Sequence, residues 1–140
     1  MQTDWGPARR ETGGAYHACN SYAGGLDRIM FQYVSVANDK QWQPGPYPGV
    51  ELMVLHENQT TGGVVVLRKF DAGVTVPAHA HPLANEFVFV LSGQWVESGV
   101  SYSTGAFFFA PKGERHGPHE AKTEVISLTM FDGPLTIAKV

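Results

Sequence analysis

The sequence predicts an all-β domain, either a sandwich or a barrel, and three observations support this. From residue 28 onward, short runs of β-branched and aromatic residues are separated by Gly, Pro, Asn and Asp, the pattern of strands and turns. Glycines lie where tight reversals need a positive φ, as in Asp71-Ala72-Gly73 and Ser92-Gly93. No segment stands out as long enough for a helix. Connections this short imply antiparallel neighbours.

The expected strands follow one another at short spacing along the chain. They span residues 28–36, 50–56, 63–70, 74–79, 86–91, 94–98, 106–110, 123–131 and 135–138. The stretch 42–49 contains three prolines and is expected to be a rigid surface loop.

The domain organisation follows from length and composition. The chain has 140 residues, which fits one domain able to bury its own core. Residues 1–27 are rich in Gly, Ala and polar groups and show no sustained period, so we expect an N-terminal arm there. Residues 28–140 are expected to form a single domain.

The charge balance and the single cysteine exclude several classes of protein. Ten basic and 13 acidic residues leave a net charge of −3, and no basic cluster is present that could bind nucleic acid. Cys19 has no partner for an intramolecular disulfide, which favours a reducing compartment. The N-terminus lacks the features of a signal peptide, and the apolar runs are far shorter than the roughly 20 residues that span a bilayer. We therefore expect a cytoplasmic protein that binds neither nucleic acid nor membranes.

Residues with metal-binding chemistry follow Gly73. His79 and His81 are two residues apart, so in a strand both side chains point to the same face. The segment 82–85 then reverses the chain and brings Glu86 next to the histidine pair. Two nitrogens and one oxygen in one patch can hold a cation.

A second segment repeats this logic. Pro111 and Gly113 predict a turn, and His116 opens the strand expected after it. Three neutral imidazoles and a carboxylate suit Fe(II), Mn(II), Ni(II), Cu(II) or Zn(II), whereas Mg(II) and Ca(II) favour oxygen ligands. We therefore expect one divalent transition-metal ion, with Fe(II) favoured, provided that the fold brings His116 opposite the first patch.

These two segments resemble the two sequence motifs of the cupin superfamily. The first is Gly73-(x)5-His79-x-His81-(x)4-Glu86-(x)6-Gly93, and the second is Gly105-(x)5-Pro111-x-Gly113-(x)2-His116. One position departs from the pattern: Glu120 stands where the second motif usually has Asn, which is not a metal ligand in the family. The resemblance implies a double-stranded β-helix, or jelly-roll, barrel with one metal ion inside, held by residues His79, His81, Glu86 and His116.

A closer resemblance concerns the end of the chain. The run 127–135 is similar to the ends of small cupin dioxygenases that cleave carbon–carbon bonds of diketones or hydroxyacetophenones. This implies an oxidoreductase whose small-molecule substrate is an enolisable or hydroxyaryl ketone. Those enzymes commonly use three histidines, so Glu86 is either a fourth ligand or a carboxylate that orients a ligating imidazole.

Two other functions fit the same ligand set. One is a non-redox isomerase or lyase, in which the metal polarises a carbonyl and Glu86, Glu120 or His119 acts as the base. The other is a regulatory module that binds zinc or a small ligand without turnover, similar in its barrel to the zinc-binding cupins attached to anti-sigma factors. The sequence alone does not separate these hypotheses from the dioxygenase.

Other chemistry-bearing residues are expected to have simpler roles. His119 lies three residues past His116, an odd offset that turns it to the other face of a regular strand, so we expect a surface or rim position. Glu114 and Arg115 are expected in a solvated turn. His17 and Cys19 have a metal-like spacing, but a lone pair of this kind does not predict a site.

Aromatic residues alternate along the strands expected at 86–91, 94–98 and 106–110. We expect one aromatic face, with Phe87, Phe89, Trp95, Phe107 and Phe109, to fill the barrel or line a pocket. The opposite face, with Val88, Val90 and Phe108, would then be covered by the second sheet or by another subunit. We therefore expect a homodimer.

Overall fold

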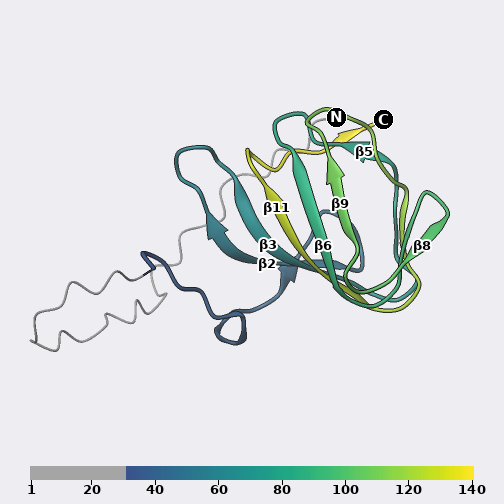
Figure 1. Ribbon diagram of the computed structural model, residues 1–140, viewed down its shortest axis with the longest axis horizontal. Helices are drawn as coiled ribbons and strands as arrows, with labels where there is room; N and C mark the ends of the chain where they lie inside the picture. The colour runs from purple at the N-terminus through teal and green to yellow at the C-terminus, as the bar shows by residue number, and fades with distance from the viewer. Residues whose placement is uncertain (1–30) are drawn as a thin grey trace, which may run out of the picture. The chain divides into compact units, whose positions relative to one another are not determined.

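The computed structural model describes residues 31–140 (Figure 1). The arm expected at 1–27, with His17 and Cys19, lies outside the described residues. Residues 31–34 and 35–140 belong to two different compact units, and all regular secondary structure of the described chain lies in the second. The domain boundary expected at residue 28 stays a prediction.

The described residues contain one short 3₁₀ helix and twelve strands, so the all-β prediction is confirmed. The elements are η1 (Ala37–Asp39), β1 (Gln43–Pro44), β2 (Val50–Glu57), β3 (Val64–Phe70), β4 (Thr75–Val76), β5 (His79–Ala80), β6 (Glu86–Ser92), β7 (Trp95–Glu97), β8 (Val100–Tyr102), β9 (Phe107–Ala110), β10 (His119–Ala121), β11 (Val125–Phe131) and β12 (Ala138–Lys139). Within residues 31–140, no helix has the length and apolar character required to cross a membrane.

Several expected element boundaries are wrong. Residues 31–36, the described part of the strand expected at 28–36, contain no strand, and Val34 and Val36 are exposed rather than covered by a neighbour. The loop expected at 42–49 includes β1, which pairs with β2. The strand β8 was not predicted, because it is only three residues long and has too few residues to show alternation. The strand expected to open at His116 begins three residues later, as β10.

The strands form two main antiparallel sheets. The six-stranded sheet has the order β1-β2-β3-β11-β6-β9, and the four-stranded sheet has the order β4-β10-β7-β8. Figure 1 shows β3, β11, β6 and β9 side by side in the larger sheet. Because β11 lies between β3 and β6, strands far apart in the sequence are neighbours, as in a double-stranded β-helix and unlike a simple meander. A small third sheet pairs β5 with β12.

The main core lies between the two sheets. Its buried apolar residues come from both of them: Val50, Phe70, Val76, Val88, Val90, Trp95, Ala121 and Val125. Trp95 of the smaller sheet packs edge-on against Phe70 of the larger one, with ring centroids 5.2 Å apart. Each Val or Phe side chain buried in this way contributes about 1.5–3 kcal/mol to stability.

The expected orientation of the aromatic strands is wrong. Val88, Val90 and Phe108 face the core, whereas Phe89, Phe107 and Phe109 are exposed on the outer face of the larger sheet. Counted from the buried Glu86 at the start of β6, side-chain alternation places Val88 inside and Phe87 outside. Of the five aromatic residues expected in the interior, Trp95 alone is fully buried there.

Candidate metal centre

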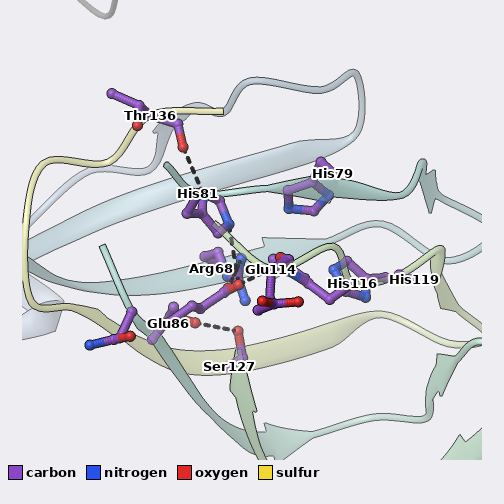
Figure 2. A network of polar contacts seen from close by, with 12 residues as sticks. Arg68, His79, His81, Glu86, Glu114, His116, His119, Ser127 and Thr136 are labelled. Atoms are coloured by element: carbon purple, nitrogen blue, oxygen red, sulfur yellow. Dashed lines mark hydrogen bonds and ion pairs between the residues drawn. The ribbon is translucent and has the colours of Figure 1, made fainter. Parts of the chain in front are cut away.

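Four residues from the two sequence motifs come together inside the barrel (Figure 2). His79 begins β5, His81 follows it, Glu86 begins β6, and His116 lies in the loop before β10. One ligand atom of each residue lies within 4.8 Å of the others. His79, His81 and Glu86 are only 2–3% exposed, and His116 is half-buried. The structure therefore brings all four predicted residues into one cluster.

The backbone holds the two motifs together. His79 and His116 exchange two backbone hydrogen bonds of 3.0 Å, each N–H donating to the other's carbonyl, and their ring centroids are 4.5 Å apart. The N–H of Gly113 also donates to the carbonyl of His81 at 2.9 Å. The position of one motif is thus fixed by the other. His116 does not open a strand, as the sequence suggested, but forms an isolated bridge with His79.

A polar network fixes the turn before Glu86. Asn85 donates through its backbone N–H and its side-chain amide to the two carboxylate oxygens of Asp132, at 2.8 and 2.6 Å. The side-chain oxygen of Asn85 accepts a hydrogen bond of 2.8 Å from the N–H of Lys112. Asn85 therefore connects the start of β6 with the end of β11 and with the turn of the second motif.

The three histidines share one hydrogen-bonding pattern. Each Nδ1 lies close to a backbone carbonyl, that of Pro77 for His79 at 2.9 Å, that of Thr136 for His81 at 2.8 Å and that of Glu114 for His116 at 3.2 Å. A carbonyl can only accept, so these contacts place the proton of a neutral ring on Nδ1 and leave the Nε2 lone pair available.

The available nitrogens fit a divalent metal ion. Nε2 of His81 and Nε2 of His116 are buried and make no hydrogen bond of good geometry within residues 31–140. Both approach the same carboxylate oxygen, Oε2 of Glu86, at 3.2 and 2.9 Å. Buried imidazole lone pairs and a carboxylate oxygen directed at one point are the donor set that transition metals prefer, so these residues could hold such an ion.

Arg68 is the charged partner of this cluster. It lies on β3, only 8% exposed, and its Nη1 forms an ion pair of 2.8 Å with Oε1 of Glu86 (Figure 2). Burial alone would raise the pKa of Glu86, but the charge of Arg68 and the contacts with His116 and His81 hold that pKa well below its ordinary value of 4.5. Glu86 is therefore a carboxylate, the form that binds metals.

Burial affects the histidines differently. Desolvation lowers the pKa of His79 from 6.5 to about 4, so this ring is neutral at physiological pH. Burial also lowers the pKa of His116, but the contact with the Glu86 carboxylate outweighs it, and the net pKa is raised above 6.5. In the metal-free protein the ring of His116 therefore holds a second proton more readily than the ring of His79.

The expected surface or rim position of His119 is wrong. His119 is buried, and its ring centroid lies 5.3 Å from that of His79 and 5.5 Å from that of His116. The parity argument failed because no regular strand joins His116 to His119: the loop between them contains Gly117, whose φ is +84°. Nδ1 of His119 is hydrogen-bonded to Glu97.

The side chains of the remaining candidate residues are not among the four of the cluster. Glu120 follows His119 on β10 and forms a partly exposed ion pair of 2.9 Å with Lys122. Glu114 and Arg115 are exposed in the turn before His116, as expected. Glu120 is therefore not beside the four-residue cluster, whereas His119 is.

A small cavity adjoins the cluster. Its walls include His79, His81, His119, Arg68 and Tyr47. The other lining residues are mainly apolar: Pro46, Val50, Leu52, Phe70, Val76, Phe131, Leu135 and Ile137. A cavity with mainly apolar walls and a few polar groups is the usual form of a small-molecule site.

Sequence reasoning missed two residues of this region, Arg68 and Glu97. Arg68 follows Val64 and Val66 at a spacing of two on β3, so a charged residue on an apolar face was a signal in the sequence. Glu97 had no comparable signal, because its contact with His119 depends on the pairing of β7 with β10.

Comparisons with solved structures support the fold. A chain of an RmlC-like cupin from Ralstonia eutropha JMP134 is 22% identical with a TM-score of 0.61; the match covers 70% of this chain and 66% of that one. The acetylacetone dioxygenase from Acinetobacter johnsonii is 20% identical with a TM-score of 0.63 and 83% of both chains covered. A chain from the complex of Rhodobacter sphaeroides SigE with the anti-sigma ChrR is 24% identical with a TM-score of 0.55, and 68% of this chain matches 51% of that one. Identities this low show a shared fold and nothing of activity.

The comparison with protein families is more specific. No curated protein sequence matches this chain. Residues 32–136 match the family model of the ChrR cupin-like domain, which covers three quarters of the sequence and both motifs that supply the cluster. With the predicted cupin barrel confirmed by the fold, the chain belongs to the ChrR cupin-like domain family.

Proposed function

We propose that this protein is a metal-dependent, dioxygenase-like oxidoreductase that acts on a small oxygenated substrate, an enolisable or hydroxyaryl ketone. The observation that carries the proposal is the buried cluster of His79, His81, Glu86 and His116 beside a mainly apolar cavity. The fold shared with the acetylacetone dioxygenase of Acinetobacter johnsonii supports it. The single cysteine in the sequence supports a reducing, cytoplasmic location.

Each part of the site has a role in this proposal. A divalent ion held by the four residues would act as a Lewis acid toward an oxygen-containing ligand. Nε2 of His79, His81 and His116 and Oε2 of Glu86 would hold it, and the carbonyl contacts of the three Nδ1 atoms would orient the rings. The apolar walls would exclude water and select a ligand with an apolar body.

The experiment combines metal analysis with oxygen consumption. Protein purified without chelators or a metal-affinity column is expected to contain iron, or another redox-active transition metal, in nearly equimolar amount. It is expected to consume oxygen when β-diketones or hydroxyaryl ketones are added. His79→Ala and His116→Ala are expected to lose the metal, and His56→Ala, which changes an exposed histidine of β2, is the matched control.

One observation favours a second function, a zinc-binding regulatory module without turnover. The family match is to the ChrR cupin-like domain, and one similar structure is the complex of SigE with the anti-sigma ChrR. Stoichiometric zinc with no oxygen uptake and no conversion of any ketone would support this function. Conversion of a ketone without oxygen uptake would instead indicate an isomerase or a lyase.

A further inference from the structure

Two residues that line the cavity beside the cluster carry buried hydrogen-bond donors without a partner in the described part of the chain. Nε and Nη2 of Arg68 and the hydroxyl of Tyr47 are buried, and none of them makes a hydrogen bond within residues 31–140. Both residues line the cavity. A buried donor without a partner costs free energy, and the cost is larger when the donor carries a charge. A ligand in the cavity that accepts hydrogen bonds from these groups would remove this cost.

The guanidinium of Arg68 is held in place from several sides. Nη1 forms the ion pair with Glu86, and the guanidinium carbon lies 5.3 Å from the ring centroid of Phe70 and 5.9 Å from that of Trp95. Only one edge of the group is occupied by Glu86, and the planar fork of an arginine can bind a second oxygen group at its other nitrogens. The side chain is therefore already positioned for a ligand.

The charges of the site favour an anion. In the metal-free protein, Arg68 and Glu86 neutralise each other. Among the described residues lining the cavity, Arg68 is the one with a permanent charge. A divalent ion bound by Glu86 and neutral histidines would make the whole site positive, because a single carboxylate cannot balance both the ion and the guanidinium. A bound anion would reduce this excess of positive charge.

We propose that Arg68 is the anion-recognition residue of this cavity, and that the ligand of the site is a small molecule with one anionic oxygen group, a carboxylate or an enolate, on an apolar body. This inference rests on the proposed function in that it concerns the same cavity and metal cluster. It narrows the substrate class to molecules bound as anions, with the charged end at Arg68 and the apolar body against the remaining walls.

Isothermal titration calorimetry tests this proposal. Each probe is titrated into the 140-residue protein loaded with redox-inert zinc. The probes are isovalerate as the carboxylate, acetylacetone as the enolate source, and isovaleramide as a neutral molecule of the same shape as isovalerate. Isovalerate or acetylacetone is expected to bind at least about tenfold more tightly than isovaleramide. The probe that shows this preference identifies carboxylate or enolate as the bound group.

The variant Arg68→Lys keeps a positive charge beside Glu86 but removes Nε and Nη2. It is expected to weaken binding of the preferred anion by about tenfold and to leave isovaleramide binding unchanged. Lys69→Gln is the matched control, because Lys69 is the next residue on β3 and pairs with Glu51 on the outer face of the sheet. The Lys69→Gln variant is expected to bind the anion as tightly as the original protein does.

Three results would overturn the anion assignment: equal binding of anion and amide, full anion affinity in Arg68→Lys, or no binding of either anion at tens of millimolar. A second readout covers a variant that does not fold. The Nε–H signal of Arg68 in a nitrogen-15 spectrum of the original protein is expected to shift on adding the anion, and an unchanged signal would also overturn the assignment. Zinc content is measured in every sample, so failure to bind metal would reject the proposed function separately.

Discussion

Glu97 fixes the ring of His119 beside the candidate metal centre. The two residues are directly opposite each other on β7 and β10, and Oε2 of Glu97 is hydrogen-bonded to Nδ1 of His119. The same carboxylate accepts hydrogen bonds from Nε1 of Trp95 at 3.1 Å and from the N–H of Gly117 at 2.8 Å. Gly117 directly follows His116, so one carboxylate connects the core, the His119 ring and the loop that carries a candidate ligand.

The variant Glu97→Gln is expected to lower the free energy of unfolding by about 1–2 kcal/mol. An amide has one accepting oxygen in place of two, so at least one of the three donors loses its partner. Burial alone would raise the pKa of Glu97, but the bond to His119 lowers it, so the native group is the charged acceptor. Urea unfolding of the metal-free protein measures the change.

The matched control is Glu120→Gln, because Glu120 lies on β10 in a partly exposed ion pair with Lys122. Its effect on the free energy of unfolding is expected to stay below about 1 kcal/mol. Equal changes in the free energy of unfolding for the two substitutions would show that the three hydrogen bonds accepted by Glu97 do not stabilise the fold more than a partly exposed ion pair does.

A larger effect is expected from Glu86→Gln. The substitution keeps the shape of the side chain but leaves the buried charge of Arg68 without its partner, so the metal-free protein should lose about 3–5 kcal/mol of unfolding free energy. Metal affinity should fall as well, since a carboxylate oxygen is removed from the cluster. Thermal or urea unfolding and a zinc competition assay measure the two effects.

Glu51→Gln is the control for this substitution. Glu51 pairs with Lys69 on the outer face of the sheet, where solvent replaces the lost interaction, and the expected change is about 0–1 kcal/mol. A Glu86→Gln protein as stable as Glu51→Gln would mean that Arg68 finds another partner or is hydrated.

Much of the candidate site could be predicted from the sequence because its residues lie in two short segments. His79, His81 and Glu86 fall within eight residues, and side-chain alternation and one turn are enough to bring them together. His116 required long-range information, which came from the resemblance of its segment to a known motif and not from spacing. The observed backbone bridge between His79 and His116 is the contact that joins the two segments.

The residues that were missed depend on pairing between distant strands. Arg68 reaches Glu86 because β11 lies between β3 and β6, an order that no local pattern specifies. His119 was assigned to the wrong face because counting along a strand assumes that the strand is continuous, and the loop at Gly117 breaks it. For β6 the same counting would have succeeded, since the buried Glu86 sets which residues face inward.

The affinity for zinc is expected to fall as the pH is lowered from 8 to 6. Burial lowers the pKa of His116, but the contact with Glu86 outweighs it and raises the pKa above 6.5. Below that raised pKa the metal-free protein holds an extra proton on this ring, and the metal must displace it. His79, with a pKa of about 4, is already neutral over this range and releases none. Below the pKa of His116 the affinity should change by up to about tenfold per pH unit, the limit for one proton.

Zinc titrations at pH 6, 7 and 8, each in two buffers of different ionisation enthalpy, measure both the affinity and the number of protons released. The Glu86→Gln variant is the informative comparison, because it removes the contact that raises the pKa of His116 and should move the pH dependence to lower pH. A zinc affinity that is constant from pH 6 to 8 would contradict the prediction that zinc displaces a proton from His116.

The outer face of the larger sheet predicts a homodimer, although not through the residues first expected to form the interface. Apolar side chains form two rows across neighbouring strands: Leu67, Leu128, Phe89 and Phe107 in one, and Val65, Met130, Phe87 and Phe109 in the other. Phe107, Phe109 and Phe89 are 60%, 52% and 42% exposed. The exposed apolar residues of this face, with Leu91, Leu128 and Met130, present on the order of 500 Å², a patch that is large for a monomer.

Two copies that pack these faces against each other would bury about 1,000 Å² in total, the area at which specific interfaces begin. The same patch on both subunits suits a two-fold interface. Light scattering at tens of micromolar is expected to give twice the chain mass. Phe107→Lys should shift the protein to the monomer. Val100→Lys changes an apolar position of similar exposure on β8 of the other sheet, and this variant should remain dimeric. A monomeric mass for the unsubstituted protein would show that this face is not an interface between copies of the chain.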